Sequence, residues 1–285
     1  MIKRTVEPHN TLAHTENAEC LEADVMDFAY RGKKFTLTGA SEEDHIVSVI
    51  RDTGAFYELD LLEYMQWAIA KREGKGRAGL VIDIGGNIGN HAVYIGTFIA
   101  KHIIVIEPNP ESLVFLHENL KSNLEDYTLH ECALGASPGF GRVHMPENAA
   151  DNLGMATIVS DDKGLINIRT LDDLINEQSE EFKMTTPVTA MKIDVEGMEI
   201  SVLKGARDVL QRDCPELFIE AGTPKHLSEI EALLDEFGYC KVATWAATPT
   251  HHFTTKRKAT TRLSIFAYKV RRRLKHRLKW LTGSA

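Results

Sequence analysis

Short apolar runs alternate with predicted helices through the middle of the chain, and this alternation constrains the fold more than any other feature of the sequence. Residues 79–84, 103–106, 188–194 and 217–221 form apolar runs of strand length, and a predicted helix follows each run. Strands that are apolar on both faces are typical of parallel sheets that helices cover on both sides. The sequence therefore predicts an α/β fold with a doubly wound, mostly parallel, seven-stranded sheet.

The last strand of this sheet is open to two interpretations. The expected strands cover residues 79–84, 103–106, 127–134, 188–194, 217–221, 239–245 and 262–269. The expected helices cover residues 56–72, 90–100, 110–123, 171–177, 199–211 and 225–237. Residues 262–269 also fit a helix, but Leu263, Ile265 and Ala267 alternate with polar or aromatic neighbours. We favour a strand here, because strand 239–245 otherwise has no closing partner, and this choice leaves His251 and His252 on a loop.

Composition divides the chain into three parts. Residues 1–55 form an N-terminal extension with two short strands within residues 25–38, residues 56–269 form the main domain, and residues 270–285 form a basic tail. A chain of 285 residues with 43% apolar side chains can bury one full core. It has no apolar run of the roughly 20 residues that cross a bilayer and no apolar signal at its start, so we expect a cytoplasmic protein. Its four cysteines show no paired spacing, which indicates neither a zinc knuckle nor a disulfide framework.

Charge is distributed unevenly along the chain. All 41 acidic residues lie at or before Glu236 and 12 of the 33 basic residues follow it, so the first part carries a formal charge of −20 and the second +12. The acidic body argues against nucleic acid as a partner. In the tail, Val270, Leu274, Leu278 and Leu281 share one face of a predicted basic amphipathic helix. Such a helix is either simply solvated or contacts an anionic surface, for example as a peripheral protein on the inner face of a membrane.

The strongest functional signal is a glycine-rich turn where strand 79–84 ends and a helix begins. Its sequence is Asp83-Ile-Gly85-Gly86-Asn87-Ile-Gly89. Glycines allow a backbone to turn tightly and to approach a bound ligand closely. The spacing differs from the Gly-x-Gly-x-x-Gly pattern of dinucleotide sites, and the Asp83 carboxylate would repel a pyrophosphate. It suits the ammonium and sulfonium of S-adenosylmethionine instead. Taken alone, the turn also fits an ordinary tight connection.

A second acidic residue strengthens the prediction of a cofactor site. Glu107, followed by Pro108, comes directly after strand 103–106. A carboxylate at such a strand end can accept hydrogen bonds from both ribose hydroxyls of a nucleotide-type ligand. Glu107 by itself would also fit a helix cap or a surface carboxylate. Together with the glycine turn, it favours a cofactor that carries a ribose.

Segments spread over residues 56–240 carry a resemblance to a known family. They are Phe56-Tyr-Glu-Leu, Val81 to Gly89, Val105-Ile-Glu-Pro-Asn-Pro110, Glu118 to Asn123, Ala133-Leu-Gly135, Asn152 to Ala156, Thr170 to Asp173, and Met191-Lys-Ile-Asp-Val-Glu-Gly-Met-Glu199 leading into Val202 to Ala206. In these segments the chain resembles the FkbM-type methyltransferases. The resemblance implies a Rossmann-like class I fold, S-adenosylmethionine as methyl donor and, most often, O-methylation of sugars or natural products. The residues assigned to the cofactor site are Asp83, Gly85, Asn87, Gly89, Glu107, Pro108 and Ala133.

Carboxylates at the ends of two later strands are the catalytic candidates. Asp194 and Glu196 follow strand 188–194, and Glu220 lies near the end of strand 217–221, at the sheet edge where ligands of open α/β sheets bind. A carboxylate near the transferred methyl group can orient or deprotonate an acceptor hydroxyl. Asp194 is the first candidate and Glu196 the second, while Glu220 also fits a charge that flanks a helix. For Lys192 and Glu199 we favour structural roles, in an ion pair and at a helix start.

The expected acceptor is a small molecule or a glycan, specifically a hydroxyl of a saccharide, glycolipid or secondary metabolite. Asn152 is a further candidate contact to the acceptor, suggested by the resemblance, while His91 is expected to pack over the cofactor loop. No zinc-type ligand spacing occurs, and we expect no required metal. Two other classes remain open at this point: a nicotinamide-dependent oxidoreductase on a related sheet, and a non-catalytic adaptor that keeps the cofactor fold.

Overall fold

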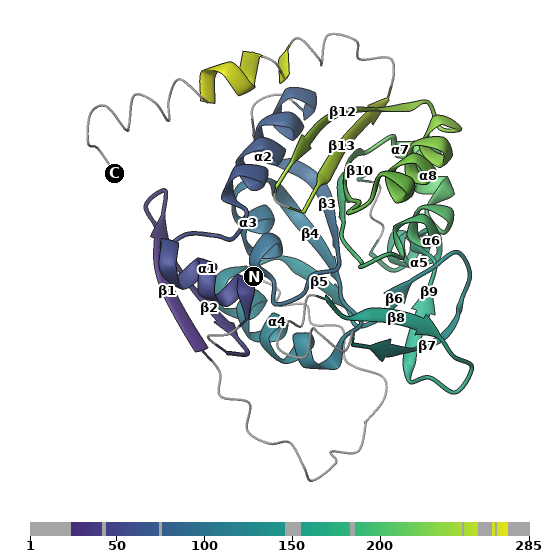
Figure 1. The fold of residues 1–285 in the computed structure, drawn as a ribbon, viewed down its shortest axis with the longest axis horizontal. Helices are drawn as coiled ribbons and strands as arrows, with labels where there is room; N and C mark the ends of the chain where they lie inside the picture. Colours follow the sequence, from purple (N-terminus) through teal and green to yellow (C-terminus); the bar gives the residue numbers. More distant parts are fainter. Residues whose placement is uncertain are drawn as a thin grey trace.

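Seven strands form the central sheet of the computed structural model (Figure 1). They are β3 (Ala78–Ile84), β4 (Ala100–Ile106), β5 (Tyr127–His130), β10 (Val188–Ile193), β11 (Glu216–Glu220), β12 (Tyr239–Trp245) and β13 (Thr250–Thr255). Their order is β12-β13-β11-β10-β3-β4-β5. The pairs from β11 through β10, β3 and β4 to β5 are parallel, whereas β13 runs antiparallel to both of its neighbours. The predicted doubly wound, mostly parallel seven-stranded sheet is confirmed.

The structure describes most of the chain. The described residues are 24–41, 44–73, 76–145, 155–182, 186–246, 248–255, 264–265 and 267–272. The predicted acceptor contact Asn152 lies outside them, as do Leu274, Leu278 and Leu281 of the predicted tail helix. Contact of the tail with an anionic surface therefore stays a prediction.

Helices cover both faces of the sheet, as the uninterrupted apolar strands require. One face carries α2 (Leu59–Glu73), α3 (Asn90–Phe98) and α4 (Pro110–Asn123), together with the hairpin of β1 (Asp24–Tyr30) and β2 (Lys33–Gly39) and the helix α1 (His45–Thr53). The other face carries α5 (Leu171–Phe182), α6 (Glu199–Lys204), α7 (Arg207–Asp213) and α8 (Pro224–Asp235). Predicted helix 199–211 is thus two helices, broken at Gly205. In the described part of the chain, no helix is long and apolar enough to cross a membrane.

A smaller sheet follows β5 along the chain. It consists of β6 (Ala133–Leu134), β7 (Gly139–His144), β8 (Thr157–Ser160) and β9 (Ile166–Arg169), in the order β6-β9-β7-β8. The predicted strand 127–134 is therefore split, with β5 in the large sheet and β6 in the small one.

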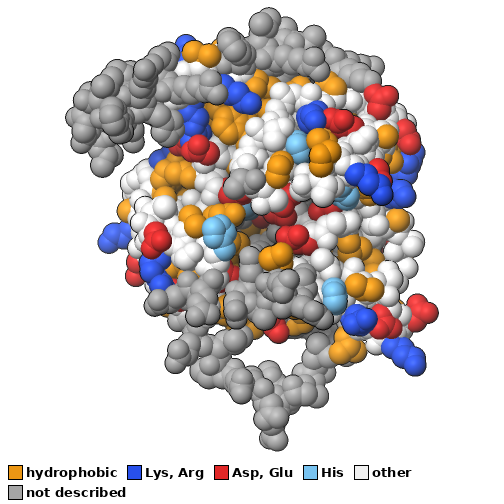
Figure 2. All heavy atoms as spheres, in the orientation of Figure 1, with side chains coloured by type: hydrophobic (Ala, Val, Ile, Leu, Met, Phe, Trp, Pro, Cys, Tyr) orange, Lys and Arg blue, Asp and Glu red, His pale blue; other side chains and the backbone are white. Residues whose placement is uncertain are grey.

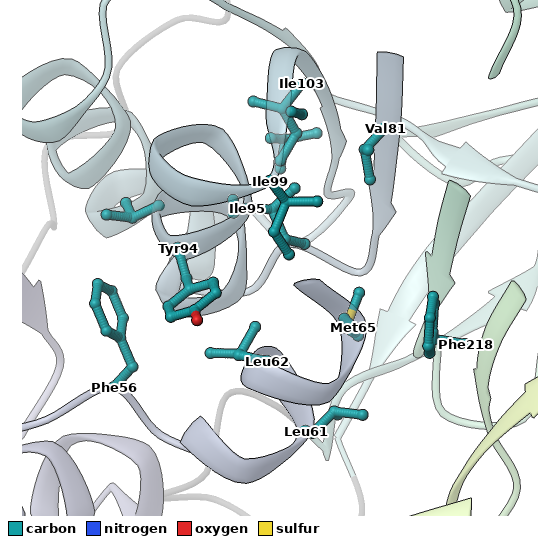
Figure 3. Close-up of a cluster of buried hydrophobic side chains, with 14 of the residues drawn as sticks. Phe56, Leu61, Leu62, Met65, Val81, Tyr94, Ile95, Ile99, Ile103 and Phe218 are labelled. Carbon is teal, nitrogen blue, oxygen red and sulfur yellow. The ribbon is translucent and has the colours of Figure 1, made fainter. Parts of the chain in front are cut away.

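The alternation of side chains along the strands decides which polar groups face α2 and α3. Figure 3 shows Val81 of β3 and Phe218 of β11 in the same buried cluster as Leu61, Leu62 and Met65 of α2. Because side chains two positions apart share a face, Asp83 lies on the same side as Val81 and Glu220 on the same side as Phe218. The Asp83 and Glu220 side chains, at the ends of β3 and β11, therefore lie on the face that α2 and α3 cover.

The N-terminal hairpin packs on the same core as the central sheet. Phe28 and Phe35 belong to the buried cluster that also contains α2 and α3. The Asn119 amide on α4 accepts a hydrogen bond from Thr38 N–H (2.7 Å) and donates to the Thr38 carbonyl (2.8 Å) and the Ile88 carbonyl (2.7 Å). One side chain of α4 thus ties the extension to the glycine turn.

The predicted strand at residues 262–269 is wrong. The seventh strand is β13, which contains His251 and His252, while residues 264–265 and 267–272 are helical and Arg272 pairs with Asp60 and Glu63. The polar sequence of β13 hid it from pattern analysis, because polar residues usually indicate exposure. Here His252 is buried between two partners, Tyr64 (Nδ1 to hydroxyl, 2.7 Å) and Glu216 (Nε2 to Oε2, 2.8 Å). A strand with buried polar side chains, of which His252 has partners for both ring nitrogens, therefore joins β11 to β12 in place of an apolar strand.

Removing the Tyr64 hydroxyl tests this arrangement. We expect Tyr64→Phe to lower the free energy of unfolding by about 1–3 kcal/mol, because it leaves the buried His252 Nδ1 without its partner. Urea denaturation measures the change, with Tyr127→Phe at a partly exposed position of β5 as the matched control. Equal stability of the two variants would contradict the importance of this hydrogen bond.

Candidate active site

The glycine turn brings the ends of β3, β4 and β10 together. Gly85 has φ +84° and Gly89 has φ +91°, a region that favours glycine, and Asn87 has φ +46°. A Cβ atom on Gly85 would lie 1.8 Å from the carbonyl oxygen of Asp194. The backbone N–H groups of Gly85 and Gly86 donate to the Ile106 carbonyl at 2.9 and 3.1 Å. Only a residue without a side chain allows β10 to approach the turn this closely.

Glu107 connects the turn to the end of β4. It is 6% exposed, and its carboxylate accepts hydrogen bonds from the N–H groups of Asn87 and Asn109, both at 2.8 Å. Burial raises the pKa of Glu107 to about 7, although the two N–H groups act in the opposite direction. The predicted ribose carboxylate is therefore fixed in place by backbone groups, with further lone pairs available to a ligand.

Asp83 is fully buried beside Lys192 of β10. Its Oδ1 lies 3.6 Å from Lys192 Nζ, and neither carboxylate oxygen has a hydrogen-bond partner within the described residues. Burial raises the pKa of Asp83, and the Lys192 ammonium opposes that effect. Lys192 is 2% exposed and also binds Asp194 Oδ2 at 3.1 Å. The predicted structural ion pair of Lys192 is confirmed.

The three catalytic candidates lie together at the ends of β10 and β11. Carboxylate oxygens of Asp194, Glu196 and Glu220 all lie within 4.8 Å of one another. Burial raises the pKa of Asp194, but the Lys192 ammonium, with smaller effects of His91 and Glu220, leaves that pKa below the ordinary value. Burial and the neighbouring Asp194 raise the pKa of Glu220 to about 9 and that of Glu196 to about 7. Glu220 also shares a hydrogen bond with Asp194. The cluster thus combines the ionised Asp194 with Glu220, which holds its proton at neutral pH, and Glu196, which is only partly protonated there.

Glu199 shapes the loop that carries Glu196. Its Oε1 accepts hydrogen bonds from the N–H groups of Val195 and Gly197, both at 3.2 Å, and its Oε2 lies 2.7 Å from His226 Nε2. Glu196 has φ +49° and Gly197 has φ +98°, so the loop is sharply turned. Glu199 is buried and has the structural role that we favoured, although it binds the loop rather than the helix that begins there.

The structure adds three residues that the sequence did not assign to the site, namely Tyr57, Glu58 and Asn90. The Asn90 amide accepts from Tyr57 N–H (3.0 Å) and donates to the Tyr57 carbonyl (3.1 Å), which fixes the chain just before α2. Glu58 Oε2 then lies 3.4 Å from His91 Nε2. Both Asp194 and Glu220 act electrostatically on the Tyr57 hydroxyl. The resemblance of Phe56-Tyr-Glu-Leu was the signal available for Tyr57 and Glu58, but it did not place them here.

Figure 2 shows acidic side chains gathered in a hollow near the centre of the face drawn, with histidine side chains beside them. Two predicted cofactor residues are placed less directly. Pro108 lies between Glu107 and the N-cap residue of α4, and Ala133 is buried in β6, where it pairs with Ile168 of β9. Their contact with a cofactor stays a prediction.

The sheet is parallel except for β13, a glycine turn follows β3, and the buried carboxylate of Glu107 follows β4. This combination defines a class I methyltransferase. A family model described as the methyltransferase FkbM domain matches residues 83–240. The chain belongs to the FkbM methyltransferase family, and its methyl donor is S-adenosylmethionine.

Two curated proteins and one solved structure illustrate the relationship. The hexuronic acid methyltransferase AglP of Haloferax volcanii is 32% identical over 129 residues, which cover 45% of this chain and 50% of that protein. The chain thus spans about half the length of that relative. The methyltransferase sdnD of Sordaria araneosa is 25% identical over 192 residues, 56% of this chain and 73% of that protein. A methyltransferase FkbM structure from Methylobacillus flagellatus KT has 20% identity and a TM-score of 0.43, and the match covers 66% of this chain and 47% of that one.

The residues present fit S-adenosylmethionine. Asp83 offers two buried oxygens without hydrogen-bond partners, which suit a positively charged ligand group. The Gly85 turn has no side chain that would keep a ligand away from the backbone, and Glu107 offers carboxylate lone pairs for ribose hydroxyls.

The ribose role of Glu107 predicts a pH dependence of cofactor binding. The group that accepts two hydroxyl hydrogen bonds is the carboxylate, and its pKa in the ligand-free protein is about 7. Below pH 7 binding must expel a proton, so we expect the affinity for S-adenosylhomocysteine to fall by about tenfold for each pH unit and to level off above pH 7. Isothermal titration calorimetry measures this. Glu107→Gln should bind more weakly and lose most of the pH dependence, whereas an unchanged profile in that variant would contradict the role.

Proposed function

We propose that the protein transfers a methyl group from S-adenosylmethionine to a hydroxyl of a saccharide, glycolipid or secondary metabolite. The observation that carries this proposal is the cluster of Asp194, Glu196 and Glu220 next to the glycine turn. A hydroxyl is a weak nucleophile that must be oriented and must lose a proton, and carboxylates can do both. The hexuronic acid methyltransferase among its relatives supports a sugar as the acceptor.

The carboxylates divide these tasks by their environments. When bound, the cofactor supplies an electrophilic methyl group on its sulfonium. Asp194 stays ionised beside Lys192, so it accepts a hydrogen bond from the acceptor hydroxyl and orients the hydroxyl oxygen toward that methyl group. Glu196, with a pKa of about 7, is matched to accept a proton near neutral pH. Glu220 shares its proton with Asp194 and holds that carboxylate in position.

Membership of the FkbM family selects a methyltransferase over the nicotinamide-dependent oxidoreductase considered from the sequence. A non-catalytic adaptor would bind the cofactor without turnover. These cases are separated by a screen in which extracts of the source cell are incubated with the protein and S-adenosylmethionine that carries a labelled methyl group. Mass spectrometry of the labelled product then identifies the acceptor and the methylated atom. Binding of S-adenosylhomocysteine without any labelled product would favour the adaptor.

Substitution of Asp194 tests the chemical role directly. We expect Asp194→Asn to lower kcat by about 10²-fold, because a neutral amide accepts the hydrogen bond of the hydroxyl less well and orients its oxygen less firmly toward the methyl group. The affinity for S-adenosylhomocysteine should change little, and calorimetry checks this. Asp126→Asn, at a side chain that is 70% exposed, is the matched control. A strong loss of cofactor affinity with unchanged kcat would place Asp194 in cofactor binding instead.

We further propose that methyl transfer needs no metal ion. The Lys192 ammonium already lies 3.1 Å from Asp194 and 3.6 Å from Asp83, so a cation compensates these carboxylates without a metal. Activity should therefore survive dialysis against EDTA. Loss of activity that added Mg²⁺ restores would show that the carboxylate cluster binds a metal in the working enzyme.

A further inference from the structure

A short helix late in the chain packs on α2 through aromatic rings. Residues 267–272 are helical, and Figure 1 shows this helix beside α2. The ring centroid of Tyr268 lies 4.5 Å from that of Trp67 on α2 and 6.1 Å from that of Trp245 on β12. Each of these three side chains is partly exposed. Aromatic rings from three distant parts of the chain thus meet at the surface of the protein.

Two lysine side chains lie over these rings. Lys71 Nζ is 5.5 Å from the ring centroid of Trp67, and Lys269 Nζ is 5.1 Å from that of Trp245. An aromatic face attracts a cation at such distances without neutralising its charge. Neither ammonium forms an ion pair with a carboxylate of the described residues. Both positive charges therefore remain available to a ligand.

Arg272 fixes the helix on α2 and compensates the acidic side chains beside it. Its guanidinium pairs with Asp60 and lies 3.2 Å from Glu63 Oε2, and it donates a hydrogen bond to the Tyr268 hydroxyl at 3.2 Å. Because residues four apart lie on the same side of a helix, Tyr268 and Arg272 face α2 together. The two carboxylates of α2 next to the aromatic rings are thus already paired.

The other side of this helix is basic and partly apolar. Val270 is 40% exposed, and the neighbouring Arg271 is also exposed. No acidic residue follows Glu236 in the sequence, whereas 12 basic residues do, and they precede and follow this helix. The described residues with these properties form an aromatic–basic surface, which consists of Trp67, Lys71, Trp245, Tyr268, Lys269, Val270 and Arg271.

We propose that the aromatic–basic surface binds the headgroup layer of a bilayer that contains anionic phospholipids. Tryptophan and tyrosine rings favour the boundary between water and lipid, because they combine an apolar body with a polar edge. The cations beside them attract anionic headgroups. A nucleic acid would meet the same cations, but the body up to Glu236 carries a formal charge of −20 and repels an extended polyanion. A flat lipid surface touches this one face of the protein, and such contact is independent of the methyl acceptor.

Neutral variants of the two lysines test the proposal. Co-sedimentation compares vesicles of phosphatidylcholine with vesicles that also contain phosphatidylserine. We expect the protein to bind the second kind more tightly, and less tightly as salt is added. Lys71→Gln and Lys269→Gln should each weaken binding about fivefold, the usual effect of one charge near an anionic bilayer. Lys225→Gln, at an exposed position of α8 on the other face of the sheet, is the matched control and should bind as the wild type does.

Tryptophan fluorescence identifies the part of the chain that touches lipid. The three tryptophans are Trp67, Trp245 and Trp280, so Trp280→Phe leaves the two rings of the aromatic–basic surface. Brominated lipid chains quench tryptophan fluorescence at short range. We therefore expect vesicles of brominated phosphatidylcholine and phosphatidylserine to quench the fluorescence of Trp280→Phe.

Equal binding to both kinds of vesicle, or binding to neither, would overturn the proposal. Unchanged binding of Lys71→Gln, or no quenching in Trp280→Phe, would also overturn it and would assign any lipid contact to other residues of the basic tail. Calorimetry with S-adenosylhomocysteine should give the affinity of the wild type in every variant, which shows that the variants are folded. Loss of that binding would concern the methyltransferase function, so the two failures can be told apart.

Discussion

The site depends on the ion pairs that the Lys192 ammonium makes with Asp83 and Asp194. The ammonium lies almost fully buried between Asp83 of β3 and Asp194 just beyond β10, and it compensates two carboxylates that would otherwise repel each other. Breaking such a buried arrangement by removing one partner typically costs about 3–5 kcal/mol. The close contact of Gly85 with the Asp194 carbonyl follows from the same proximity of strand ends. Charge compensation and the absence of a side chain together allow the cofactor turn and the carboxylate cluster to share one space.

This arrangement separates two functions across neighbouring strands. The ends of β3 and β4 provide Asp83, the glycine turn and Glu107, where backbone groups fix the positions of the side chains. The ends of β10 and β11 provide Asp194, Glu196 and Glu220, whose pKa values are driven apart by Lys192 and by burial. Under the proposed roles, the cofactor part relies on fixed geometry, and the acceptor part relies on groups that can hold or release a proton.

The segment just before α2 contributes to the site, and the N-terminal extension packs beside it. Its hairpin is tied to α4 through Asn119, and the segment before α2 is tied to α3 through Asn90. The Asn90 amide brings Tyr57 and Glu58 to His91, more than 30 residues away in sequence. A chain that kept only the central sheet and the helices after it would lose the contacts of Tyr57 and Glu58 with this part of the site.

The sequence by itself determined the local features of the protein. Apolar runs and glycine positions predicted β3, β4, β10 and β11, the turn from Asp83 to Gly89, and the strand ends at which Glu107, Asp194 and Glu220 lie. The place of β13 in the sheet could be seen only in the folded protein, because the buried His252 of β13 is stabilised by Tyr64 and Glu216 from distant elements. The tertiary structure also decided the contact of Glu58 with His91 and the sharing of Lys192 between two strands. The periodicity of the sequence indicates which face of a strand or helix a residue occupies. These contacts depend instead on strand register and helix packing, which bring together residues that are far apart in the sequence.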